Sequence, residues 1–252
     1  AMFMDDLLAA GYAVFDANVL PTTFGTDIMG RALGSPAYVN VLKAAYDYIV
    51  KNYNVTEKIF AHGISMGGVG ASAFVNAYPH LVLAESSFAG RDLSQYIYQI
   101  ATGYYDNDDD YAVPWGYSDL ADLNADKWSH IEGSAPSLSL LKYTNGILDY
   151  PPDRETEYLQ WLEYYGEIQS HGKDDAIGQY TAYRITPYKA WDSWNDNIGR
   201  TKAKLILQKA FRAGSSVPYE VVVYDNATHT ELSYGQIADM RNQLIAWYKR
   251  WE

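Results

Sequence analysis

The sequence of 252 residues has no cysteine, no long apolar run and an excess of negative over positive charge. Without cysteine, the chain cannot form a disulfide, use a thiol nucleophile or hold a cysteine-ligated zinc. Its apolar runs are all shorter than the ~20 residues that a membrane-spanning helix needs, so we expect no membrane partner. The 31 acidic against 19 basic residues give a formal charge of -12, which repels phosphate backbones, so we expect no nucleic-acid partner either.

The rest of the composition is typical of a folded globular protein. Hydrophobic residues make up 48% of the chain and charged residues 20%, and a chain of this length can bury a sizeable core. The sequence starts without a signal peptide, so we expect a cytoplasmic protein, with secretion as the alternative if an upstream segment has been removed.

Strand-like and helix-like segments alternate along much of the chain. Apolar residues at three- and four-residue spacings mark the helix-like segments, and β-favouring runs mark the strands. This alternation predicts an α/β fold, a mostly parallel sheet flanked by crossover helices, in a single domain over 1–252. The predicted strands are 12–17, 58–62, 81–84, 188–191 and 219–224, and the predicted helices are 4–10, 36–53, 68–77, 202–213 and 237–251.

The alternation stops over residues 90–185. This stretch is rich in aromatic and acidic residues and contains a further helix-like segment, 154–168. Because sheet strands lie on both sides of it, we interpret it as a lid inserted over the sheet and not as an independent domain. Its aromatic residues either offer a stacking surface for sugar or aryl groups or pack the insertion onto the sheet.

One short motif points to chemistry. Gly63-Ile64-Ser65-Met66-Gly67 matches G-x-S-x-G, and it lies between a predicted buried strand and a small-residue helix. In that context the serine occupies a tight strand-to-helix turn, a nucleophile elbow, from which its hydroxyl projects above the sheet. The alternative interpretation is a glycine-rich turn with an incidental serine.

A serine nucleophile needs a base, and a histidine is the usual one. His229 is the best candidate, because it follows the predicted strand 219–224 through a short loop and precedes the last helix. His62 abuts the motif but lies on its strand, where a packed or hydrogen-bonded role is favoured. The other three histidines, at positions 80, 130 and 171, are expected to be exposed or capping groups.

The base in turn needs a carboxylate to orient it. Parallel strands deliver the loops at their carboxyl ends to one edge of the sheet, so the loop after the strand ending at Trp191 is the best place. Asp196 lies there and is our choice, while Asp192, in the same loop, and Asp92, after the preceding strand, stay open as alternatives.

With these features the sequence resembles the α/β-hydrolase superfamily, in particular its branch of esterases and prolyl-oligopeptidase-like serine hydrolases. The chain order of serine, acid and histidine agrees with that family. The matching segments are Tyr12-Ala13-Val14-Phe15-Asp16, Tyr53-Asn54-Val55, Gly63-Ile64-Ser65-Met66-Gly67-Gly68, the loop with Asp196, and Thr228-His229.

The resemblance implies hydrolysis of a small-molecule carboxylic ester through an acyl-enzyme on Ser65. His229 would relay the proton, Asp196 would orient the imidazole, and the main-chain amide of Met66 would stabilise the oxyanion. A peptidase of the prolyl-oligopeptidase type is an alternative with the same residues.

Relative to that family, the first three strands of the sheet are missing from this sequence. We expect an upstream segment, a second copy of the chain or a rearranged sheet to fill the gap, because unpaired buried strand edges are costly. A truncated, catalytically impaired homologue that acts in binding or assembly is therefore the competing hypothesis.

No cofactor or metal is expected. The acidic run Asp106-Asn107-Asp108-Asp109-Asp110 invites a calcium interpretation, but Tyr111 and Tyr117 stand where a calcium-binding loop of the EF-hand type needs Gly and Glu. A solvated acidic loop is the favoured interpretation.

Overall fold

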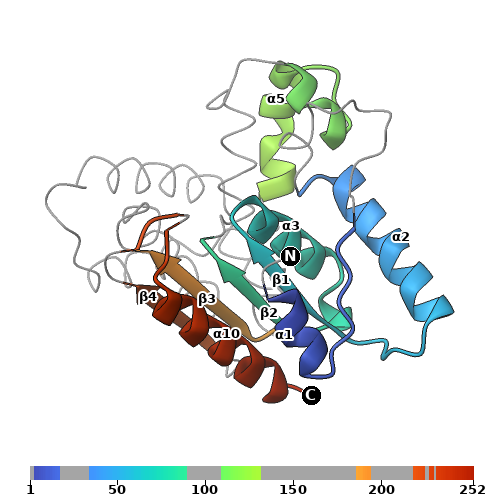
Figure 1. Cartoon of the computed structure of the whole chain (residues 1–252). Coiled ribbons are helices and arrows are strands. Elements are labelled where there is room, and N and C mark those ends of the chain that lie inside the picture. The colour runs from blue at the N-terminus through green and yellow to red at the C-terminus, as the bar shows by residue number, and fades with distance from the viewer. Residues whose placement is uncertain are drawn as a thin grey trace, which may run out of the picture.

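The computed structural model describes residues 3–17, 34–89, 109–131, 186–193, 218–224, 227–229 and 231–252. Within these ranges, four strands form one sheet in the order β1-β2-β3-β4, and each neighbouring pair is parallel. The strands are β1 (Ile59–Ile64), β2 (Val82–Phe88), β3 (Tyr188–Ser193) and β4 (Tyr219–Tyr224). Helices pack on the sheet (Figure 1), so the predicted α/β class is confirmed.

Two of the longer helices begin at a serine that caps them. Ser35 accepts a hydrogen bond from the Tyr38 amide at 3.2 Å, and Pro36 follows at the first helical position, where it loses no hydrogen bond. Ser233 and Gln236 form a reciprocal capping box at the start of the last helix. The longer helices are α1 (Met4–Ala9), α2 (Pro36–Asn52), α3 (Met66–Ala77), α5 (Leu120–Ile131) and α10 (Tyr234–Lys249), and single 3-10 turns span Pro79–Leu81, Asp109–Tyr111 and Val113–Trp115.

Strand β2 runs four residues beyond its predicted end. Its second half contains Glu85, Ser86 and Ser87, three polar residues that are nevertheless buried. Other side chains satisfy both serine hydroxyls. The Ser87 hydroxyl lies 2.8 Å from the Tyr188 hydroxyl, and the Ser86 hydroxyl lies within hydrogen-bond distance of His62 and Tyr248. Polar residues that find hydrogen-bond partners in the interior can continue a strand. The hydrophobic pattern ends at Ala84, and this is why it predicted too short a strand.

The predicted strand at 12–17 is wrong. These residues have no regular secondary structure and do not belong to the sheet. Instead, the Tyr12 ring makes edge contacts with Phe60 of β1 and with Tyr248 of α10, each with ring centroids 5.8 Å apart. Tyr12 and Val14 are thus partly buried by side-chain packing and not by strand pairing, Phe15 is exposed, and β1 stays at one edge of the described sheet.

The two faces of the sheet are covered by different helices. On one face, a core of Phe88, Trp191, Leu244 and Trp247 joins β2 and β3 to α10, with Leu7 of α1 packed into the same cluster. Helices α1 and α10 come from opposite ends of the chain yet lie side by side (Figure 1), and Arg241 reaches Asp6 at 3.5 Å.

The other face is covered by α2 and α3. Their side chains Tyr46, Phe74 and Val75 pack on Ala61 of β1 and Val82 of β2. Successive residues of a strand point to opposite faces. Each face of this sheet therefore contributes apolar residues to one of the two clusters, as expected for parallel strands that are covered by helices on both faces.

Two parts of the sequence interpretation fall largely outside the described residues. Of the proposed lid at 90–185, the structure describes 109–131, with α5 and two 3-10 turns, and residues 154–168 lie outside. The predicted helix at 202–213 also lies outside the described ranges. In the part of the chain that is described, no helix is long and apolar enough to span a membrane.

Candidate active site

Ser65 is the single residue between the end of β1 and the start of α3. Its backbone has φ 53° and ψ -120°, a conformation that residues with a side chain rarely adopt. Two main-chain hydrogen bonds hold this turn: the Ser65 amide donates to Phe88 at 2.9 Å, and the Gly68 amide donates to the Ser65 carbonyl at 3.0 Å. The surrounding structure thus overrides the local strain and places Ser65 above the carboxyl end of the strand.

The glycines of the motif are not equivalent. A Cβ atom at Gly63 would lie 2.1 Å from the main-chain oxygen of Gly67, which is far inside van der Waals contact. Gly63 is therefore required for the strand and the helix to approach each other. A Cβ atom at Gly67 would meet no heavy atom of the described residues within 4 Å, apart from its chain neighbours and its own helix backbone.

The structure brings Ser65 and His229 together. The imidazole Nε2 of His229 lies 2.8 Å from the Ser65 Oγ, within hydrogen-bond distance. Both residues are half-buried, so the pair is shielded but not sealed from solvent. The other predicted histidine near the motif, His62, does not take part in this contact.

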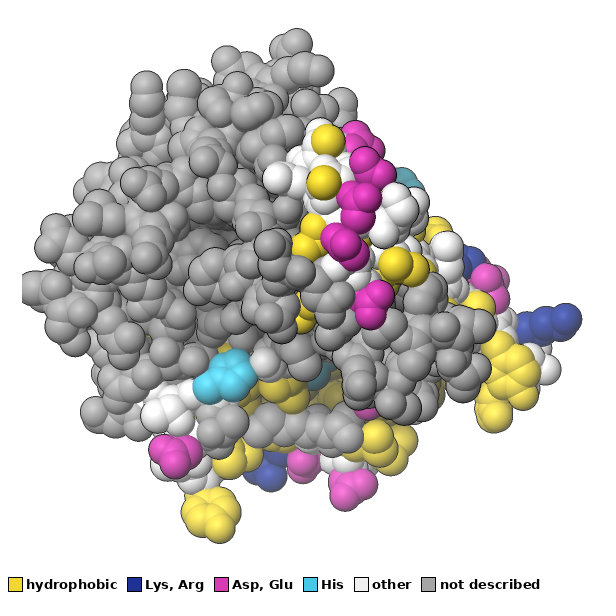
Figure 2. Space-filling model, turned by 90° about the horizontal axis from the view of Figure 1, so that it is seen from above, with side chains coloured by type: hydrophobic (Ala, Val, Ile, Leu, Met, Phe, Trp, Pro, Cys, Tyr) yellow, Lys and Arg dark blue, Asp and Glu magenta, His cyan; other side chains and the backbone are white. Residues whose placement is uncertain are grey.

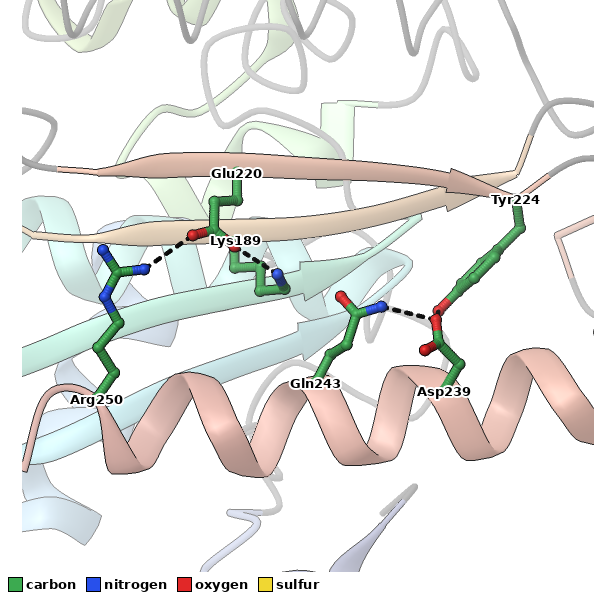
Figure 3. A network of polar contacts seen from close by, with 6 residues as sticks. All are labelled: Lys189, Glu220, Tyr224, Asp239, Gln243 and Arg250. Carbon is green, nitrogen blue, oxygen red and sulfur yellow. Dashed lines mark hydrogen bonds and ion pairs between the residues drawn. The ribbon is translucent and has the colours of Figure 1, made fainter.

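The segment that carries His229 is held at both ends. At its start, the hydroxyl of Tyr224, the last residue of β4, donates to Asp239 of α10 at 2.8 Å, and Gln243 donates to the same carboxylate oxygen at 2.7 Å (Figure 3). Next to the histidine, the Thr228 amide donates to the Glu231 carbonyl at 3.1 Å. These bonds join the end of β4 to α10 and close a short turn around His229.

The structure describes the remaining predicted site residues to different extents. Met66 is the first residue of α3, so its main-chain N–H lies at the helix N-terminus, directly after Ser65. Asp192 lies on β3, opposite Val223 of β4, and its side chain is not described. Asp196 and Asp92 lie outside the described residues. The identity of the acid therefore stays a prediction.

His62 of β1 belongs to a second polar network, with Ser86 of β2 and Tyr248 of α10. Its Nδ1 lies 2.9 Å from the Ser86 Oγ, which in turn lies 3.0 Å from the hydroxyl of Tyr248. Part of the residue is accessible, but Nε2 is fully buried and has no hydrogen-bond partner among the described residues. Burial lowers the pKa of His62 to about 4, so its imidazole is neutral near pH 7.

The sequence predicted a packed or hydrogen-bonded role for His62 but did not identify its partners. Ser86 and Tyr248 come from β2 and α10, and no local pattern relates them to a histidine on β1. The network links the strand that precedes Ser65 to the helix that follows His229.

Acidic side chains gather on the face of the molecule seen in Figure 2, drawn in magenta, and a histidine side chain is exposed on the same face. The exposed aspartates of residues 109–131 include Asp109, Asp110, Asp122 and Asp126. The carboxylate of Asp109 caps α5 by accepting from the Leu120 amide at 3.0 Å. Within the described ranges, no group of three or more His, Asp or Glu side chains could hold a metal ion.

No protein-family model matches the sequence, and no curated protein matches it. Several solved structures resemble the chain. A puromycin hydrolase is 13% identical, with a TM-score of 0.49 over 90% of this chain and 27% of its own. A puromycin-hydrolysing peptidase of Mycobacterium tuberculosis is 15% identical, with a TM-score of 0.46 over 87% of this chain and 26% of its own. The α/β hydrolase GrgF from Penicillium sp. sh18 is 17% identical, with a TM-score of 0.44 over 85% of this chain and 71% of its own.

The chain thus spans about a quarter of the length of the two puromycin-hydrolysing proteins and 71% of GrgF.

Proposed function

We propose that this protein is a serine hydrolase that cleaves small carboxylic esters through an acyl-enzyme on Ser65. The observation that carries the proposal is the 2.8 Å separation of the Ser65 Oγ and the His229 Nε2. A serine hydroxyl is a weak nucleophile on its own, and an adjacent histidine that removes its proton makes it competent. The strained backbone of Ser65 supports the same role, because such strain is concentrated at functional sites.

In the proposed mechanism, the Ser65 Oγ attacks the ester carbonyl carbon while the His229 Nε2 takes the hydroxyl proton. The carbonyl oxygen gains a negative charge, and the Met66 amide at the N-terminus of α3 stabilises it. The C–O bond to the alcohol then breaks, and the imidazolium of His229 gives its proton to the departing oxygen. A water deprotonated by His229 attacks the acyl-enzyme and releases the acid and the free serine.

A carboxylate completes this proposal by holding the imidazole of His229 in the correct tautomer. Asp196 is the proposed acid, and Asp192 and Asp92 are the alternatives. Comparing the three Asp→Asn variants for loss of turnover identifies which of them acts. No cofactor or metal is needed for the proposed steps.

The experiment is active-site labelling with a fluorophosphonate, together with turnover of p-nitrophenyl acetate. We expect the wild type to be labelled and active and Ser65→Ala to lose both properties. Ser118→Ala, a change at an exposed serine, is the matched control and should behave as the wild type. Equal labelling of the wild type and Ser65→Ala would contradict the assignment of the nucleophile.

The same experiment separates the competing functions. Cleavage of short proline-containing peptides in preference to esters would favour a peptidase. Absence of turnover and labelling, combined with a stable oligomer in solution, would favour a protein that acts in binding or assembly, in which a second copy completes the sheet.

A further inference from the structure

His229 lies within a turn that Thr228 closes with two hydrogen bonds. The Thr228 amide donates to the Glu231 carbonyl at 3.1 Å, and the Glu231 amide donates to the Thr228 Oγ1 at 3.0 Å. The first bond joins main chain to main chain, whereas the second needs the side chain. Threonine and serine commonly stabilise turns in this way, because their short hydroxyls reach main-chain groups a few residues along the chain.

The core holds this turn on both sides. Ala227, directly before Thr228, is completely buried in the apolar cluster that joins α10 to the sheet. Leu232, directly after Glu231, packs against the same cluster. Between these two anchors, Thr228 and His229 are half-buried and Glu231 is exposed. Burial thus holds the flanks of the turn, and the two local hydrogen bonds hold its middle, where His229 lies.

The position of the His229 main chain matters because the imidazole must reach Ser65. The His229 Nε2 lies 2.8 Å from the Ser65 Oγ. A general base works within about 2.6 to 3.2 Å of the oxygen whose proton it removes, so a shift of about 1 Å breaks the contact. The proposed carboxylate would set the tautomer and rotation of the ring, whereas the turn sets the position of the main chain that carries it.

We propose that Thr228 is a positioning residue: by accepting from the Glu231 amide, its hydroxyl keeps the turn closed and holds the His229 imidazole against Ser65. The inference rests on the proposed function. In this role Thr228 exchanges no proton with the substrate and acts only through His229. Loss of the hydroxyl leaves the main-chain bond to Glu231 in place, so the turn loosens while the fold is kept.

The test compares Thr228→Val, which removes the hydroxyl and keeps the branched shape of the side chain, with Thr228→Ser, which keeps the hydroxyl. For p-nitrophenyl acetate, we expect kcat of Thr228→Val to fall by about 10-fold to 100-fold, because a catalytic group misplaced by about 1 Å costs that much. The rate of labelling by the fluorophosphonate should fall with it, and Thr228→Ser should stay close to the wild type in both measurements. Thr228→Ala is a second variant without the hydroxyl, for use if the valine does not fold.

Thr56→Val is the matched control. The Thr56 Oγ1 donates to the Lys58 carbonyl at 2.9 Å in the exposed connection before β1, at the opposite end of that strand from Ser65. The substitution removes the same kind of local bond between side chain and main chain. We expect it to leave kcat and the labelling rate unchanged, and urea unfolding would compare the stability of all the variants.

A kcat of the hydroxyl-free variants equal to that of the wild type would overturn this inference and leave the proposed function standing. So would an equal loss in Thr228→Ser, or a loss of kcat that only follows the unfolded fraction of the protein. A wild type that neither reacts with the fluorophosphonate nor hydrolyses the ester would overturn the proposed function, and the inference with it.

Discussion

The Oγ of Ser65 and the Nε2 of His229 lie 2.8 Å apart, although 164 positions separate the two residues in the chain. Ser65 follows β1 and His229 comes after β4, and the strands that the structure describes from β1 to β4 pair in parallel. Parallel strands bring the segments after them to a common edge, so distant residues can meet without any loop crossing the sheet.

His229→Gln should lower kcat for p-nitrophenyl acetate by about 100-fold or more, because general-base catalysis is lost while the fold is kept. Steady-state kinetics would measure the effect. His80→Gln, at an exposed histidine, serves as the control and should leave kcat unchanged. A kcat for His229→Gln close to that of the wild type would remove His229 from the mechanism.

Gly63→Ala should destabilise the protein by about 2 kcal/mol or more, because its Cβ atom would lie 2.1 Å from the Gly67 oxygen and force the strand and helix apart. The free energy of unfolding in urea would measure this. Gly67→Ala, four residues away in the same motif, should not be destabilised. Equal stability of the two variants would mean that strand and helix can separate at little cost.

His62 should make the protein less stable in acid. Burial lowers its pKa from 6.5 to about 4, so between these pH values the unfolded chain binds a proton that the folded chain does not. The free energy of unfolding therefore falls as the pH drops from 6.5 toward 4, by about 3 kcal/mol in total, and this contribution levels off at lower pH.

Urea unfolding of the wild type and of His62→Gln at pH 7, 5.5 and 4 would check this dependence. The variant should lose the part of the pH dependence that belongs to the imidazole, whatever its stability at pH 7. Parallel curves for the two proteins would show that His62 is not the group responsible.

The carboxylate of Glu220 lies between two cations in Figure 3. It accepts from the Lys189 Nζ at 2.6 Å and from Arg250 at 3.0 Å, and Lys189 is buried whereas Arg250 is exposed. Burial raises the pKa of Glu220, but the two cations outweigh this effect and hold the pKa below its usual range. The carboxylate thus stays charged and compensates the buried lysine.

Glu220→Gln should destabilise the fold by about 1 to 2 kcal/mol, because it leaves the Lys189 cation buried without its counter-charge. The cost is moderated because the Glu220 side chain is 39% exposed. Arg250→Gln is the matched control and should cost less than about 0.5 kcal/mol, as is usual for an exposed ion pair. Urea unfolding would measure both, and equal losses would contradict the distinction between the buried and the exposed partner.

Helix starts and strand positions could be predicted where capping residues or β-favouring residues within the segment itself determine them. Ser35 and Pro36 mark the start of α2, and β-favouring residues define β4 at the bounds that were predicted. Predictions failed where a segment's partner is distant in sequence. Residues 12–17 have the composition of a strand, but their position was decided by the rings of Phe60 and Tyr248.

The sequence by itself determined the strand-turn-helix unit around Ser65, because the first glycine of G-x-S-x-G meets a local steric requirement: Gly63 must face the oxygen of Gly67 without a side chain. The sequence also favoured His229 over His62 as the base, but only the tertiary structure decided that the His229 Nε2 lies 2.8 Å from the Ser65 Oγ. Three parallel pairings set the position of the His229 segment, while the hydroxyl of Ser86 holds His62 below the site. Such choices depend on contacts between residues far apart in the chain, and no short stretch of sequence contains them.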